Sequence, residues 1–144
     1  RQEQMVGGAN LVGKKVVIEG GSFIGGNGVD SSGTVNLPQS ADSVSLSIYN
    51  TQTGELVYSE TSTDIDAGFQ DLQWNGRGSQ GELVPYGSYA MTASANIDGK
   101  FTPLQVTTTA EVKSVKWNPQ LQQLSLEIGN GVYIPLSAVE RISN

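Results

Sequence analysis

The sequence predicts an all-β protein in which a β-sandwich is inserted into a small β-barrel built from both ends of the chain. Apolar and polar residues alternate with a period of two, as at Val44, Leu46 and Ile48, which is the pattern of a half-buried strand. Tight turn signals such as Asp98-Gly99 separate these runs. No segment has the periodicity of an amphipathic helix.

The sandwich is predicted over residues 31–104. Short strands with turn signals every ~8–12 residues are typical of this architecture. The chain has no Cys, so the sandwich is fibronectin-III-like, an immunoglobulin-like form without the antibody disulfide. Leu56 and Tyr58 are expected on one face of their strand. The expected strands cover residues 34–37, 43–50, 55–61, 69–74, 88–95 and 100–109.

The stretch from Trp74 to Tyr89 reads WNGRGSQGELVPYGSY and carries most of the turn chemistry. Its four glycines supply backbone angles that other residues reach only at a cost, and Pro85 fixes one of its own. Its few apolar residues are expected to pin the turns to a core. The segment therefore indicates a module that works through its shape. These pinning residues are Trp74, Leu83, Val84 and Tyr89.

The small barrel is predicted from residues 9–30 and 105–144, with residues 1–8 as a flexible lead. The first part holds a strand within residues 11–19 and a glycine-rich stretch that is a loop or a short strand around Phe23-Ile24. The second part predicts strands at 110–117, 124–128, 132–134 and 139–142, with one helical turn at 135–138. The Gly129-Asn130-Gly131 run predicts a tight hairpin.

Composition excludes several function classes. The 144 residues carry a net charge of −6, and the eight Lys and Arg residues are scattered, so neither nucleic acid nor an anionic membrane is an expected partner. The chain has no His and no Cys, which removes the commonest general base and the commonest zinc ligands. No enzymatic activity, cofactor or metal is expected, and no catalytic residue is assigned.

Four motifs were compared with known catalytic or ligand-binding patterns. Gly20 to Gly28 lacks the Gly-Lys-Ser/Thr ending of a phosphate loop and is expected to be a flexible loop. The residues around Ser22 nearly match the Gly-x-Ser-x-Gly pattern of a nucleophile elbow. The chain has no histidine, so a Ser-His-Asp triad is excluded. The acidic run of Asp64, Asp66 and Asp71 departs from an EF-hand loop, so a solvated loop is favoured over a loose calcium site. The rings of Phe23, Trp117 and Tyr133 are expected to fill a core and not to form a cation cage.

The turn-rich stretch resembles the Trp-x-Gly…Gly-x-x-Val-Pro-x-Gly-x-Tyr signature of the flagellar basal-body rod modification, or hook-capping, protein family. Residues 9–20 (ANLVGKKVVIEG) and 110–142 resemble the two segments of that family's barrel, so the resemblance covers nearly all of residues 9–144, the family's C-terminal region. The positions that carry the signature here are Trp74, Gly76, Gly81, Val84, Pro85, Gly87 and Tyr89.

The resemblance implies a Tudor-like barrel split by a fibronectin-III-like insertion, with residues 1–8 as the remnant of the family's N-terminal region. It implies a hook cap: a scaffold that is exported through the flagellar channel and promotes polymerisation of hook protein at the tip of the growing hook. The implied partners are the hook protein and further copies of the full-length protein, in a pentameric cap. The partner-binding residues are unknown from the sequence.

A second hypothesis is a surface adhesin or carbohydrate-binding accessory module on the same sandwich, since a fold does not fix a function. Exposed aromatic side chains in a row would favour it. The candidates are Tyr49, Tyr58 and Tyr86.

Overall fold

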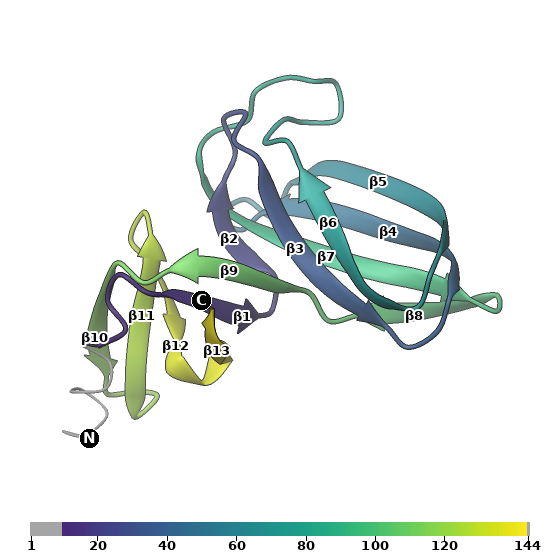
Figure 1. Cartoon of the computed structure of the whole chain (residues 1–144). Helices are drawn as coiled ribbons and strands as arrows, with labels where there is room; N and C mark the ends of the chain where they lie inside the picture. Colours follow the sequence, from purple (N-terminus) through teal and green to yellow (C-terminus); the bar gives the residue numbers. More distant parts are fainter. Residues whose placement is uncertain (1–9, 144) are drawn as a thin grey trace. The chain divides into compact units, whose positions relative to one another are not determined.

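The computed structural model describes residues 10–143 and shows an all-β protein (Figure 1), which confirms the predicted fold class. Within that range the chain forms thirteen strands and one 3₁₀ turn. It divides into two compact units. Residues 20–108 form a sandwich unit, and the described residues up to Glu19 and from Thr109 onward form a smaller unit. The predicted flexible lead, residues 1–8, lies outside the described residues.

The first sheet of the sandwich unit is antiparallel and centres on β4 (Ala41–Asn50) and β7 (Gly87–Ile97). β5 (Leu56–Ile65) pairs with β4 and forms one edge. The other side of β7 is shared: β2 (Ser22–Gly25) pairs with its first part and β8 (Lys100–Leu104) with its second. The glycine-rich stretch thus contains the short strand that was one of its two predicted forms.

The second sheet of this unit is built on β3 (Ser31–Leu37), which pairs along its length with β6 (Gly68–Trp74). Its other side pairs with the beginning of β9 (Thr107–Glu111). The single strand predicted at 100–109 is therefore wrong. β8 pairs with β7 in one sheet and β9 with β3 in the other, so the chain changes sheets between them at Gln105-Val106.

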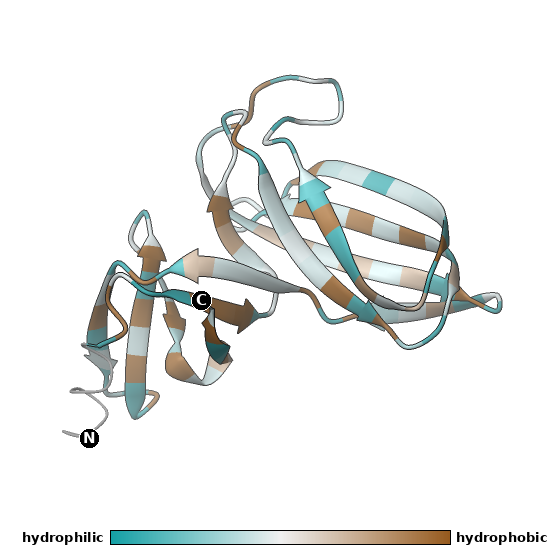
Figure 2. Cartoon of the chain, viewed as in Figure 1, coloured by the Kyte–Doolittle hydropathy of each residue, from teal (hydrophilic) through white to brown (hydrophobic). Residues whose placement is uncertain are grey.

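Inward-facing residues of the two sheets form the core of the sandwich unit, and Figure 2 shows their hydrophobic bands on β4 and β2. The alternation predicted for β4 is confirmed, because every second side chain is buried. Three aromatic rings pack together at one end: the Trp74 centroid lies 5.1 Å from that of Tyr89 and 5.8 Å from that of Phe23. The other core residues are Val35, Leu37, Ala41, Val44, Leu46, Ile48, Leu72, Val84, Met91, Ala95, Ile97 and Val106.

Two turns show how far local sequence decides the strand pairing. Asp98 and Gly99 both have positive φ, 52° and 78°, as the predicted two-residue hairpin requires. The hairpin from β4 to β5 is less regular, because its register shifts between Ile48 and Tyr49. That bulge corrects one expectation: Leu56 is exposed, whereas Val57 and Tyr58 are the residues that pack against the core.

The smaller unit holds β1 (Lys15–Glu19), which lies between the end of β9 and β13 (Val139–Ser143) in the strand order. A three-stranded antiparallel meander follows β9 in the chain, and a 3₁₀ turn at Leu136–Ala138 leads from it into β13. The predicted hairpin is confirmed at Asn130 and Gly131, both with positive φ. The meander consists of β10 (Ser114–Asn118), β11 (Gln123–Gly129) and β12 (Val132–Pro135). The buried apolar residues of the unit are Val16, Val17, Ile18, Val112, Leu124, Leu126, Ile128 and Ile134.

The division between the units differs from the predicted boundaries, 9–30 with 105–144 and 31–104. It falls after Glu19 and after Thr108. The physical reason is that β2 pairs with β7 and brings Phe23 into the sandwich core, which a local reading of a glycine-rich stretch does not reveal. Closure of the smaller unit into a Tudor-like barrel stays a prediction.

Candidate interaction surface

Two loops at one end of the sandwich unit pack against each other, and we call residues 26–30 and 75–86 the loop pair. Their backbones are joined by hydrogen bonds from the Asn27 N–H to the Val84 carbonyl (2.8 Å) and from the Gly28 N–H to the Gly76 carbonyl (3.0 Å). Gly76 has φ of +74°, and a Cβ there would lie 2.6 Å from the Val29 nitrogen. Only glycine permits this approach.

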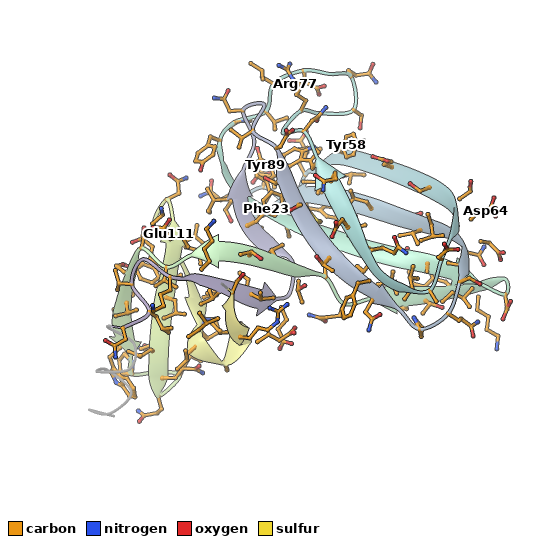
Figure 3. The ribbon with its side chains drawn as sticks, in the orientation of Figure 1. Phe23, Tyr58, Asp64, Arg77, Tyr89 and Glu111 are labelled. Carbon is orange, nitrogen blue, oxygen red and sulfur yellow. The ribbon has the colours of Figure 1, made fainter. Side chains whose placement is uncertain are left out.

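The longer loop is fixed to the core beneath it. The Trp74 indole N–H donates to the Arg77 carbonyl at 2.8 Å, and the Tyr89 hydroxyl donates to the Pro85 carbonyl. The Arg77 guanidinium in turn donates to the Gly81 carbonyl at 3.1 Å. Figure 3 shows Phe23 and Tyr89 close together in the sandwich interior and Arg77 out on the loop. The sequence prediction that apolar residues pin this segment is confirmed for Trp74, Val84 and Tyr89, all of which are buried.

The loop pair nevertheless exposes three large apolar side chains: Val29 at 47%, Leu83 at 56% and Tyr86 at 54% of their surface. Leu83 was expected to anchor the turn, and its exposure corrects that expectation. Its backbone pairs with that of Arg77 through an isolated antiparallel bridge within the longer loop. A rigid loop that presents apolar side chains is a candidate contact surface.

A groove of about 190 Å³ lies between β5 and β6, the two strands at the sheet edges of the sandwich unit. Val44, Leu46 and Leu72 provide apolar lining. Polar residues from the two edge strands provide the rest, including the carboxylates of Glu60 and Asp71. We call this feature the edge groove.

The net negative charge of the chain is concentrated in the sandwich unit. Residues 20–108 contain nine acidic side chains and only two basic ones, Arg77 and Lys100, which leaves −7, against −6 for the whole chain. The sandwich unit therefore attracts cationic partners. The acidic residues are Asp30, Asp42, Glu55, Glu60, Asp64, Asp66, Asp71, Glu82 and Asp98.

Two tyrosines have a raised pKa. Burial disfavours the phenolate of Tyr89, which is 1% exposed, and the negative charge of Glu55 adds to the rise of its pKa. For Tyr58 the main cause is the hydrogen bond that its hydroxyl donates to Glu60, at 2.6 Å, and burial and the charge of Glu60 raise the pKa further. Both phenols are therefore neutral donors at physiological pH.

The remaining sequence motifs are not assembled into chemical sites in residues 10–143. Residues 20–28 form β2 and its flanking turns, with no helix following to hold a phosphate. Ser22 lies within β2, opposite Ala90, and its carbonyl accepts a hydrogen bond from the Thr108 hydroxyl at 2.7 Å. The described residues contain no group of three or more His, Cys, Asp or Glu side chains that would hold a metal ion. Among them there is also no helix long and apolar enough to cross a membrane.

The aromatic candidates are also separated. Phe23 belongs to the core of the sandwich unit, whereas Trp117 and Tyr133 belong to the smaller unit. Tyr133 is 38% exposed, with the Lys116 ammonium 4.0 Å from its ring centroid, so the expectation that its ring fills a core is wrong. Tyr49 and Tyr58 do not form a row, because Tyr58 pairs with Ile48, the neighbour of Tyr49, and so lies on the opposite face of the sheet. These positions do not favour the carbohydrate-binding hypothesis. The loop pair and the edge groove are the surfaces that sequence reasoning missed.

The fold defines the class of protein: an all-β chain with an immunoglobulin-like sandwich inserted between two segments of a smaller β-unit. The sequence model of the FlgD Ig-like domain matches residues 22–99, more than half of the chain. The chain belongs to the FlgD family, which confirms the family predicted from the Trp74–Tyr89 signature.

Solved structures of FlgD proteins support the assignment over both units. FlgD from Pseudomonas aeruginosa is 30% identical, with a TM-score of 0.76, over 92% of this chain and 98% of that one. FlgD from Xanthomonas campestris, whose structure is described as giving insight into the hook capping essential for flagellar assembly, is 26% identical, with a TM-score of 0.76, over 97% and 99%.

A curated relative, the basal-body rod modification protein FlgD of Buchnera aphidicola, is 21% identical over 141 residues. The alignment covers 98% of this chain and 62% of the relative. The chain therefore spans less than two thirds of the length of this relative.

Proposed function

We propose that this chain is the C-terminal region of a flagellar hook cap, a structural scaffold that promotes polymerisation of hook protein at the distal end of the growing hook. The observation that carries the proposal is membership of the FlgD family together with a likeness to the X. campestris protein over 97% of the chain. Hook capping is the role given for that protein, and it comes to this chain through the shared family and fold.

The proposed role is not enzymatic. A cap must bind subunits weakly enough to release or move past each one after it is added, and interfaces of modest area with a polar rim meet that need. The partners are the hook protein and further copies of the full-length protein, in a cap of five subunits. The proposed location is outside the cell, reached through the flagellar export channel. We infer that the rigid loop pair, with Val29, Leu83 and Tyr86 exposed, is one contact surface.

Complementation tests this function. Cells that lack their hook cap receive the full-length parent protein, either intact or without residues 20–108. The two ends of the deleted segment are close: the Gly20 N–H donates to the Val106 carbonyl at 3.1 Å, so a short glycine linker can replace it. The readouts are hook number by electron microscopy, expression and export. A third arm carries the Leu83→Ser and Tyr86→Ser substitutions.

Hooks restored by the intact protein support the cap assignment, and loss of hooks on deletion assigns a required role to the sandwich unit. If the intact protein is expressed and exported but restores no hooks, the cap proposal is wrong, and glycan binding becomes the hypothesis to test. If the loop variant restores hooks at the intact level, the loop pair is not a required contact surface.

A further inference from the structure

The edge groove combines three features that together describe a binding site for an extended polypeptide. Both strands that border it are at the ends of their sheets, so their outer backbone edges have no neighbouring strand in the sheet order. The floor between them is apolar, and the residues along the rim include carboxylates. Unpaired strand edges next to a side-chain groove are the arrangement that proteins use to add a partner's strand to their own sheet.

The free part of the β5 edge has the right length. The Val57 carbonyl accepts a hydrogen bond from the Ser79 N–H, so the longer loop occupies the beginning of this edge. Beyond it, every residue from Ser59 to Thr63 is exposed, and Asp64, with φ of 56°, ends the extended run. At ~3.4 Å per residue this stretch offers about 17 Å of edge, enough for an extended segment of about five residues.

Glu60 decides which kind of partner fits. It lies opposite Leu46 in the β4–β5 register, so its side chain is on the core-facing side of the sheet, at the groove. An inward-pointing charge on an edge strand deters pairing with another apolar strand. The Tyr58 hydroxyl holds the carboxylate by donating a hydrogen bond at 2.6 Å. A cation on the incoming strand would meet this fixed carboxylate directly.

Charge also excludes a second copy as the occupant. Two copies paired through β5 would bring together two sandwich units that each carry −7, together with their Glu60 and Asp71 carboxylates. Like charges placed together in this way oppose association. A segment with a lysine or arginine between small apolar residues has the complementary charge and the complementary pattern.

We propose that the edge groove binds an extended segment of a partner protein, which adds as a strand to the free edge of β5 and places a lysine or arginine against Glu60. In the added strand, side chains on the groove side alternate with outward ones, so the residues two positions before and after the cation cover the apolar floor. The site is distinct from the loop pair and does not depend on the hook-cap function.

The probes are three seven-residue peptides with blocked ends. The first is Thr-Val-Thr-Lys-Thr-Val-Thr, in which Val, Lys and Val face the groove. The second replaces Lys with Glu. The third is the Lys peptide with N-methyl groups on the amides that would pair with β5, which removes its hydrogen bonds but keeps its charge. Each is titrated to millimolar concentration against the isotopically labelled chain, and backbone amide chemical shifts are recorded.

We expect the Lys peptide to shift amides of β5 and β6, and the Glu and N-methyl peptides to bind more weakly. Glu60→Gln should reduce affinity for the Lys peptide about two- to fivefold, as for an exposed ion pair. Glu60→Lys should reverse the preference between the Lys and Glu peptides. Glu111→Gln, which makes the same change of charge in the smaller unit, should leave the affinity unchanged.

Three results would overturn the proposal. One is no shift in β5 and β6 with the Lys peptide at millimolar concentration. The second is equal binding of the N-methyl peptide, which would show attraction to charge without strand addition. The third is an unchanged peptide preference in a folded Glu60→Lys variant, with folding judged by the amide spectrum of residues away from β5.

Discussion

The hydroxyl of Tyr89 donates a hydrogen bond to the backbone carbonyl of Pro85, four residues earlier in the chain. The same ring packs against Trp74 at a centroid distance of 5.1 Å and an interplanar angle of 61°. One side chain thus joins the end of the longer loop to the aromatic part of the sandwich core. A tyrosine that bonds back to the upstream backbone is a recurring device of immunoglobulin-like sandwiches.

Tyr89→Phe keeps the ring and removes only the hydroxyl. We expect the free energy of unfolding to fall by about 0.5–1.5 kcal/mol, the net contribution of a typical hydrogen bond. Equilibrium unfolding in urea measures this change. Tyr86→Phe is the matched control, because Tyr86 is 54% exposed, and its change should stay within about 0.5 kcal/mol. Equal effects of the two substitutions would contradict a structural role for the Tyr89 hydroxyl.

Gly76→Ala and Gly81→Ala separate backbone strain from steric exclusion in the loop pair. Both glycines have positive φ, +74° and +81°, so both substitutions incur about 1–2 kcal/mol of conformational strain. Gly81 faces open space, whereas a Cβ at Gly76 meets the Val29 backbone at 2.6 Å. We therefore expect the Gly76 variant to lose clearly more stability in thermal unfolding. A Gly76 variant as stable as the Gly81 variant would mean that the loop pair is looser than described.

Leu46→Ala tests the core of the sandwich unit. Leu46 is 5% exposed, and its truncation should cost about 2–5 kcal/mol through lost burial and the cavity left behind. Ser47 is the next residue of the same strand and faces the other side of the sheet. Ser47→Ala should therefore change the stability in guanidinium by less than about 0.5 kcal/mol. Comparable losses for both variants would contradict the assigned faces of β4.

Stability should decrease at high pH because the pKa values of Tyr58 and Tyr89 are raised by folding. The unfolded chain deprotonates these phenols from about pH 10, while the folded chain still holds the protons, so it binds more protons than the unfolded one. Their stabilisation is complete below the unfolded pKa and is lost as pH rises through the folded pKa. Urea midpoints measured on either side of pH ~10 test this decline.

Glu60→Gln adds a specific check on Tyr58. The hydrogen bond to Glu60 is the largest cause of the raised pKa of Tyr58. In the Glu60→Gln variant the pKa of Tyr58 should therefore lie nearer to its usual range. Tyrosinate absorbance during a pH titration reports the change. The pKa of Tyr89 is raised by burial and by the charge of Glu55, so Tyr89 should titrate as before. A titration curve identical to that of the parent chain would show that the Tyr58–Glu60 bond does not persist in solution.

Local sequence was sufficient where local chemistry decides the structure. The alternation at Val44, Leu46 and Ile48 predicted β4 and its buried face, because the side-chain period of a strand depends on neighbouring residues. Asp98-Gly99 predicted the hairpin between β7 and β8, because turn angles also depend on neighbouring residues. The bulge after Ile48 and the change of sheet at Val106 were missed, since both depend on which strand pairs with which.

The candidate surfaces were less predictable than the strands. Val29 and Leu83 are more than fifty residues apart in the sequence, and they share a surface only because the backbones of their two loops hydrogen-bond to each other. The edge groove likewise requires the order of strands in both sheets, which places β5 and β6 at the edges. The composition contained one usable signal, the scarcity of basic residues between Gly20 and Thr108.

The sandwich unit begins and ends at adjoining points: Gly20 bonds to Val106, and Ser22 accepts from Thr108. A module with adjoining ends can be inserted at a single peptide bond of another protein without stretching the strands on either side. Over evolutionary time, the gene segment that encodes it can be gained, lost or exchanged in one event.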